Sequence, residues 1–150
     1  MKIDFVEKEI PNGEVEVTVA AAERNQQVAK VIAALTSLEE SRPEVLSLKT
    51  EEGIQLVKIK DIIYIDVSET NLLIYSQNEL LVTKGRLVKF MERLKNPDFV
   101  QVSKHAVVNI NHLARLENSF SGSMLAKMSR GNQTMVSRRY VKKLTDRLGL

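Results

Sequence analysis

The chain of 150 residues contains no cysteine, only three prolines and no long run of apolar residues. The absence of cysteine excludes disulfides, thiolate metal ligands and a cysteine nucleophile. The longest apolar stretch, 62–67, is interrupted by Asp66 and is far shorter than the roughly 18 residues that a membrane-spanning helix needs. The first residues also lack the basic-then-apolar pattern of a secretory signal. A soluble cytoplasmic protein is therefore the simplest expectation.

The residues that build common catalytic and metal sites are also scarce. The only two histidines, His105 and His112, are seven positions apart, which is not a metal-ligand spacing. No serine lies in a Gly-x-Ser-x-Gly elbow, and the segment 83–86 is too short for a glycine-rich phosphate loop. Only two carboxylates, Glu117 and Asp146, follow residue 98, so a general acid/base pair is not expected there. We therefore predict that the chain is not an enzyme and has no metal, cofactor or small-molecule substrate.

Positive charge is concentrated in the last third of the chain. The formal net charge is only +3, and residues 1–50 carry 6 basic and 9 acidic side chains. Residues 101–150 carry 9 basic and 2 acidic side chains. This asymmetry suggests a polyanionic partner for the C-terminal part, although an ordinary solvated surface has the same composition.

Residues 1–44 predict a β-β-α leader. Apolar and polar residues alternate around Ile3–Phe5 and again over Val15–Val19, on either side of the turn-prone Pro11-Asn12-Gly13, which is typical of a hairpin. Over 24–40, apolar residues recur at the spacing of one helix face. That stripe needs a partner surface, either on the rest of the chain or on another copy, so we interpret 1–44 as a dimerisation or regulatory element.

From residue 45 the pattern changes to short strands separated by turns. The expected strands lie around 46–48, 54–59, 62–65, 72–75, 80–83, 99–102, 107–110, 116–120, 124–128 and 133–136. The period switches to that of a helix over 86–95, and again after Ser137, which is expected to cap the last helix. Many short strands with few helices indicate a mainly β (α+β) domain with an antiparallel sheet over 45–150.

Two arginines in the first turn of the last helix are an electrostatic oddity. Arg138 and Arg139 follow the expected cap Ser137, and Lys142 and Lys143 lie one turn further on. Helix N-termini carry partial positive charge and favour anions, so free N–H groups with two guanidinium groups can bind phosphate. A tolerated cluster of surface charge is the alternative interpretation.

A second segment interrupts a strand with polar and basic side chains. Ser103-Lys104-His105 separates Val102 from the apolar residues at 106–108. Such a loop can place donors in a DNA groove, where lysine reads guanine acceptors. An ordinary connecting loop explains the same residues, and by residue type alone it is the favoured interpretation.

Several of these blocks together resemble the LytTR DNA-binding domain. They are Phe99–Leu113, the segment 136–144 after a hairpin, the strand Ile59–Asp66, and Lys84–Leu87 followed by Leu94 and Phe99. The resemblance covers about residues 45–150. It implies an elongated antiparallel β-sheet fold with short helices that binds DNA through loops in successive major grooves.

The resemblance also implies which residues contact DNA. They are Ser68, Glu69, Thr70 and Asn71 after one strand, Ser103, Lys104 and His105 in the polar triplet, and Ser137, Arg138, Arg139 and Lys142 at the last helix. The triplet departs from the family's usual His-Arg-Ser, and Lys104 cannot form the two-pronged contact of an arginine. The resemblance implies that Asn109 supports a backbone turn and does not contact DNA.

The resemblance implies a transcription regulator related to response regulators. A leader of 44 residues is too short for a receiver domain, so we expect a stand-alone regulator. We expect it to bind paired promoter repeats in double-stranded DNA as a homodimer, and the family implies a small membrane protein that restrains it. The alternative is a protein-interaction module or an adaptor for a membrane protein, without direct DNA binding.

Overall fold

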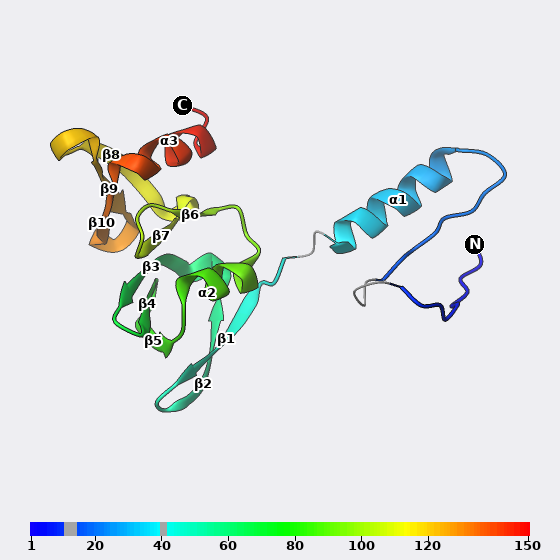
Figure 1. Ribbon diagram of the computed structural model, residues 1–150, viewed down its shortest axis with the longest axis horizontal. Coiled ribbons are helices and arrows are strands. Elements are labelled where there is room, and N and C mark those ends of the chain that lie inside the picture. Colours follow the sequence, from blue (N-terminus) through cyan, green and yellow to red (C-terminus); the bar gives the residue numbers. More distant parts are fainter. Residues whose placement is uncertain (11–14, 40–41) are drawn as a thin grey trace. The chain divides into compact units, whose positions relative to one another are not determined.

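The computed structural model describes residues 1–10, 15–39 and 42–150 (Figure 1). The chain divides into two compact units, Met1–Ser41 and Arg42–Leu150. Each unit is described by itself below. Within the described residues, no helix is both long enough and apolar enough to cross a bilayer.

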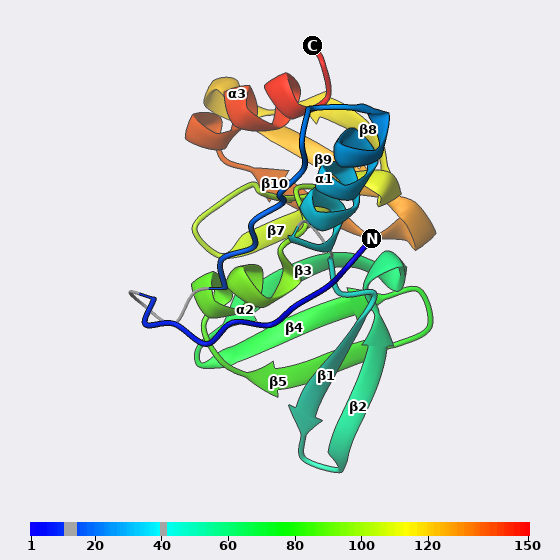
Figure 2. The ribbon, with the colours of Figure 1, turned by 90° about the vertical axis from the view of Figure 1, so that its right-hand side faces the viewer.

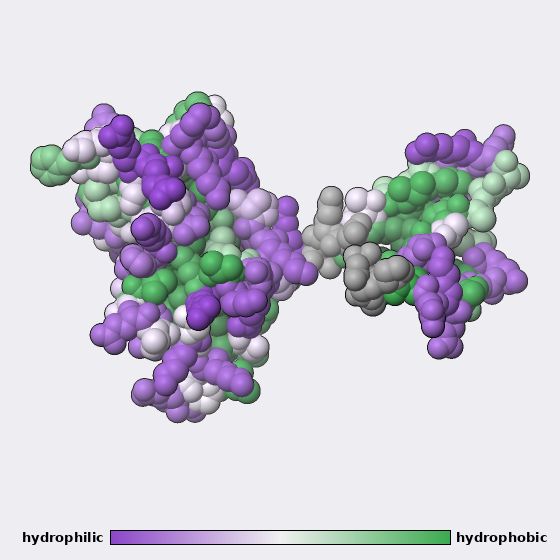
Figure 3. Space-filling model, in the orientation of Figure 1, coloured by the Kyte–Doolittle hydropathy of each residue, from purple (hydrophilic) through white to green (hydrophobic). Residues whose placement is uncertain are grey.

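The first unit contains the expected amphipathic helix, α1 (Gln26–Glu39). The side chain of Asn25 begins it, because its Oδ1 accepts the Val28 N–H at 3.0 Å. The predicted stripe is only partly covered: Val28, Val31 and Leu35 are half-buried and Leu38 is 69% exposed. Apolar residues accordingly gather on the surface of this unit (Figure 3).

The two predicted leader strands are wrong for the part of the unit that the structure describes. Residues 1–10 and 15–25 form no strand, and Lys8 meets Glu16 only through an ion pair of 2.9 Å between their side chains. The predicted turn at 11–13 lies outside the described residues. An isolated two-stranded hairpin is marginally stable, and here the apolar side of the alternation, with Phe5 91% exposed, has no third strand to pack on.

The second unit has three antiparallel sheets. A hairpin is formed by β1 (Val45–Thr50) and β2 (Gly53–Lys58). The central sheet has the order β5-β4-β3-β7-β6, with β3 (Ile62–Ser68), β4 (Asn71–Ser76), β5 (Leu80–Lys84), β6 (Phe99–Gln101) and β7 (Ala106–Asn109). The third sheet contains β8 (Leu113–Asn118), β9 (Met124–Met128) and β10 (Gln133–Val136). Figure 2 shows β3, β4 and β5 side by side.

One face of the central sheet packs against the β1–β2 hairpin and helix α2 (Leu87–Leu94). Helix α2 buries Leu87, Phe90 and Leu94, which recur at helical spacing, and most of its exposed side chains are charged. These side chains meet Ile65 and Ile74 of the sheet. Burial of each such side chain contributes about 1.5–3 kcal/mol.

The other face packs against the third sheet and helix α3 (Arg138–Arg147). Leu144 of α3 is fully buried together with Val136 and Val102. Tyr64 stacks on Tyr75 with ring centroids 4.2 Å apart, and burial raises the pKa of Tyr64 well above its ordinary value. The mainly β (α+β) architecture with an antiparallel sheet and short helices is confirmed.

Several predicted strand ends are displaced: Ile59 opens the 3-10 turn Ile59–Asp61, Val102 follows β6, and two further cases show the reason. Ile110 lies in a 3-10 turn, Ile110–His112, rather than continuing β7. The predicted strand 116–120 begins earlier, since Leu113 already pairs with Met128, and it ends before the exposed 3-10 turn Phe120–Gly122. In both cases strand pairing, which is non-local, decides where the strand lies.

Candidate nucleic-acid interface

The central sheet brings two of the predicted contact loops to one end. The β3–β4 loop follows Ser68, and the β6–β7 loop contains Lys104. The Val67 N–H donates to the carbonyl of His105 at 2.9 Å, and Asp66 pairs with Ala106 in the adjacent register. The loops 68–71 and 103–105 therefore lie next to each other.

Helix α3 begins at the same end. The Ser137 N–H donates to the Val102 carbonyl at 2.8 Å, so the first turn of α3 is joined to the strand end that precedes Lys104. We call the end of the unit that contains 68–71, 103–105 and 137–139 the loop edge. The structure thus brings together three segments that are more than 30 residues apart in the sequence.

The loop edge also contains two basic residues that the sequence analysis missed. Lys84 is paired with Asn71 in the β4–β5 ladder, and the Gly85 N–H donates to the Thr70 carbonyl at 3.1 Å. Lys84 and Arg86 are exposed and flank this contact. The segment 83–86 is conspicuously basic, but only the pairing of β5 with β4 shows that it lies beside 68–71.

Most predicted contact side chains on the loop edge are available to a ligand. Ser68, Glu69, Thr70, Lys104, His105, Arg138, Arg139 and Lys142 are exposed, and Asn71, Ser103 and Ser137 are half-buried. The Ser103 hydroxyl is already used, because it accepts the His105 N–H at 3.1 Å. Ser103 therefore shapes the loop that presents its two neighbours.

The predicted hydroxyl cap of Ser137 is not formed. Ser137 stands at the N-cap position, but its side chain caps no N–H, and its carbonyl instead accepts the Tyr140 N–H at 2.8 Å. This tight first turn replaces the usual side-chain bond. The N–H groups at the start of α3 remain open to an outside acceptor.

The cations of the loop edge are mostly unpaired. Within the described residues, Lys104, Arg138 and Arg139 form no ion pair. Lys142 differs, because it meets Asp146 at 2.8 Å and the hydrogen bond raises the pKa of Lys142. The Arg139 guanidinium lies 5.9 Å from the centre of the Tyr140 ring. Unpaired exposed cations on one edge produce a field that attracts a polyanion.

Asn109 has the supporting role that its position implied. It is 2% exposed, its Nδ2 donates to the Ile62 carbonyl at 2.9 Å, and its Oδ1 accepts the Asn111 N–H at 3.1 Å. This amide fixes the turn that follows β7, at the end of the sheet opposite the loop edge. It cannot reach a ligand on the loop edge.

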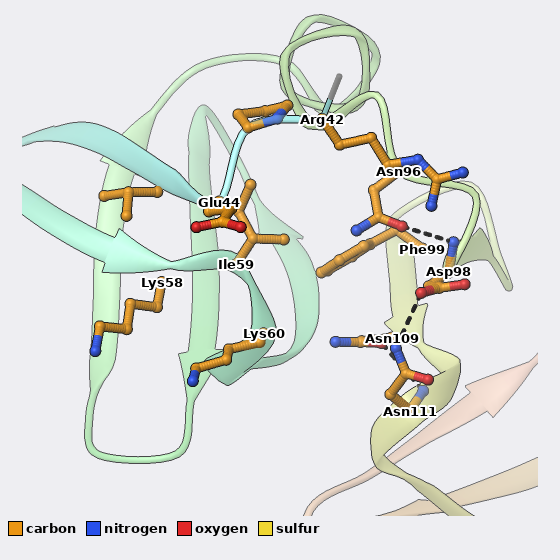
Figure 4. A pocket seen from close by; sticks show the side chains of 12 residues that line it. Arg42, Glu44, Lys58, Ile59, Lys60, Asn96, Asp98, Phe99, Asn109 and Asn111 are labelled. Atoms are coloured by element: carbon orange, nitrogen blue, oxygen red, sulfur yellow. Dashed lines mark hydrogen bonds between the residues drawn. The ribbon is translucent and has the colours of Figure 1, made fainter. Parts of the chain in front are cut away.

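A polar pocket of about 530 Å³ lies at that opposite end, lined by Arg42, Lys58, Lys60, Asn96 and Asp98, among others. Figure 4 shows Lys58 and Lys60 pointing away from Arg42, so the cations do not converge on one point. Asp98 is engaged by Asn111 at 3.0 Å and Arg147 at 2.7 Å. The cations of the pocket therefore do not share one binding point, and Asp98 is already engaged. No metal-binding cluster occurs among the residues that the structure describes.

The family of the chain follows from residues 52–149, which match the LytTr DNA-binding domain. Since that match covers most of the chain, the protein belongs to this family. The family is one of DNA-binding domains.

The chain is similar to parts of curated sensory transduction proteins. The chain is 32% identical over 99 residues to the sensory transduction protein LytT of Bacillus cereus, covering 66% of this chain and 40% of LytT. It is 25% identical over 147 residues to the sensory transduction protein LytR of Streptococcus mutans, covering 98% of this chain and 60% of LytR. The chain thus spans between two fifths and three fifths of the length of these two relatives.

A solved structure supports the fold. It is the LytTr DNA-binding domain of a Bacillus cereus protein described as a methyl-accepting/DNA response regulator, and it matches with a TM-score of 0.64. The sequence identity is 22%, and the match covers 72% of this chain and 99% of that domain. At this identity the likeness concerns the fold alone.

Proposed function

We propose that the chain binds specific promoter DNA through the loop edge, with loops entering successive major grooves. Lys104, Arg138 and Arg139 supply the main contacts, and Thr70 and Asn71 assist them. The observation that carries this proposal is the pair of backbone hydrogen bonds, Val67 to His105 and Ser137 to Val102, that joins three predicted contact loops into one surface.

The chemistry of the loop edge favours a nucleic acid. The guanidinium groups of arginines bind phosphates and the edges of guanine bases. Short amide and hydroxyl side chains bind the edges of adenine bases or phosphates. Backbone N–H groups at the start of α3 add a phosphate contact. Base contacts from several loops, instead of one inserted helix, are consistent with the short strands and turns from which the loop edge is built.

We propose that the chain binds paired promoter repeats as a homodimer. We assign the contact between the two copies to the first unit of the chain. Its helix α1 carries an apolar stripe that is only partly covered, with Ile32 39% and Leu38 69% exposed. Sedimentation of the full chain and of Leu38→Asp tests this assignment. A dimer that dissociates only in the variant supports it, and an unchanged dimer rejects it.

Selection of bound sites from a random pool of duplex oligonucleotides tests the function itself. We expect a defined sequence to be enriched, with affinity that falls steeply as salt rises. If about six phosphates are contacted, the log–log slope is near −5. Failure to enrich any sequence would reject sequence-specific binding.

The salt dependence also separates DNA binding from the rival function of a protein-interaction module. An apolar contact with another protein releases few counterions, so its affinity changes little with salt. A flat salt response, together with the absence of a selected DNA site, would favour that rival.

A further inference from the structure

The β8–β9 loop lies on the loop edge, although no predicted contact residue belongs to it. Met124, at the start of β9, pairs with both Asn118 of β8 and Val136 of β10. Val136 directly precedes Ser137, where α3 begins. The residues 119–123 are therefore next to the first turn of α3.

Arg138 lies against this loop. A Cβ atom at Gly122 would be 3.4 Å from both Cγ and Cδ of Arg138, so the aliphatic part of the arginine rests on the glycine backbone. Gly122 has φ +80°, a conformation that also favours glycine. Contact between the loop and Arg138 places the loop tip beside a cation of the proposed interface.

The loop holds one aromatic side chain in an exposed position. The Phe120 carbonyl accepts the Ser123 hydroxyl at 2.6 Å and the Ser123 N–H at 3.0 Å, and the Ser119 N–H donates to the Ser123 carbonyl at 3.0 Å. These bonds fix the turn, yet Phe120 is 90% exposed. Figure 3 shows an apolar projection at the end of the unit where Figure 1 draws the β8–β9 loop in yellow.

The surroundings of Phe120 fit DNA better than an apolar protein surface. Its loop neighbours are Asn118, Ser119, Ser121, Gly122 and Ser123, so the ring is a single apolar group among small polar ones. Protein docking sites are usually larger apolar patches. Duplex DNA instead offers isolated apolar groups, thymine methyls and deoxyribose faces, between charged phosphates.

From this placement we infer that Phe120 is a further contact on DNA, packing on a thymine methyl or a deoxyribose next to the nucleotide held by Arg138. The inference rests on the proposed function, because it extends the same interface by one loop. Phe120 adds apolar contact without charge. Its loss should therefore lower affinity while leaving the number of phosphates contacted unchanged.

The test measures DNA binding by full-length Phe120→Ala, Phe120→Leu and a control, Leu80→Ala, on the selected site across a salt series. Leu80 is 49% exposed and lies at the start of β5, opposite the loop edge. We expect Phe120→Ala to bind roughly tenfold more weakly with the same salt slope, as expected for loss of one partly buried aromatic contact. Phe120→Leu should retain most of the affinity, and Leu80→Ala should match the wild type.

Replacing thymine by deoxyuridine in the site distinguishes the two apolar groups. If Phe120 packs on a methyl, deoxyuridine at one position weakens the wild type but not Phe120→Ala, and if it packs on a deoxyribose, the replacement has no such effect. Wild-type affinity for Phe120→Ala, or a reduced salt slope, would overturn the inference. A change in oligomeric state instead of affinity would also overturn it. If the wild type itself bound no DNA, the proposed function would fail first.

Discussion

Arg147 and Asp98 clamp the far end of α3 to the central sheet, with Nη2 of Arg147 2.7 Å from Oδ1 of Asp98. Arg147 Nε also donates to the Pro97 carbonyl at 3.1 Å. The near end is held by the hydrogen bond from Ser137 to Val102. Helix α3 is therefore fixed to both ends of β6, and this attachment positions the arginines of its first turn.

Arg147→Met is expected to loosen that clamp without removing a DNA contact. The pair is partly exposed, with side chains 41% and 28% accessible, so the loss of folding stability should be no more than about 1 kcal/mol. DNA affinity should fall modestly while the salt slope stays unchanged. Thermal melts and salt-series binding check both parts. A reduced slope would mean that Arg147 itself touches phosphate.

Arg139→Ala is expected to weaken binding to every DNA sequence and to reduce the salt slope by about one if the arginine contacts phosphate. Lys60→Ala is the matched control, because Lys60 is exposed but lies at the polar pocket, at the opposite end of β3. Gel shifts on selected and unrelated DNA make the comparison. Equal effects of the two substitutions would remove Arg139 from the interface.

Lys104 is expected to read a base rather than only a phosphate. Its loop is held by backbone hydrogen bonds to β3 and to the start of α3, and a lysine fixed in this way can donate to the guanine acceptors of the major groove. Lys104→Ala should cost about 1–3 kcal/mol on the selected site and much less on sites changed at one base pair. Site selection repeated with Lys104→Ala checks this. If the enriched sequence were unchanged at every position, Lys104 would be a phosphate contact.

Asn109→Ala is expected to destabilise the fold without altering the interface. The substitution removes the donor to the buried Ile62 carbonyl, which costs about 1–3 kcal/mol, and the acceptor of the N–H of the exposed Asn111. Urea unfolding should show the loss, and the folded fraction should bind DNA with wild-type affinity. Wild-type stability would contradict the supporting role of this amide.

Local patterns were enough to predict most elements of the second unit. The strands 124–128 and 133–136 and the helix near 86–95 were predicted at their observed positions, because alternation, helical spacing and turn residues are local signals. The prediction of two strands in the leader was wrong because strand formation depends on non-local neighbours. Their alternation is present, but a strand is stable only with neighbours, and the sequence does not show which neighbours exist.

For the candidate interface too, local signals were visible in the sequence and non-local neighbours were not. Lys104, Arg138 and Arg139 stand out in the sequence as basic residues at strand and helix boundaries. Lys84 and Arg86 are equally basic, but the sequence does not show that they or Phe120 lie near the other loops, because that proximity depends on the pairing of β5 with β4 and of β9 with β10. Only the order of strands in each sheet reveals those neighbours.

Site-directed cleavage of bound DNA tests the central claim most directly, and the absence of cysteine makes it simple. An iron chelate attached at Ser68→Cys lies on the loop edge and one at Lys143→Cys lies within α3, which begins there, whereas one at Asn78→Cys lies in the β4–β5 turn at the opposite end. We predict cleavage within the selected site from the first two positions and none from the third. Cleavage from Asn78→Cys alone would contradict the assignment of the loop edge as the DNA-binding surface.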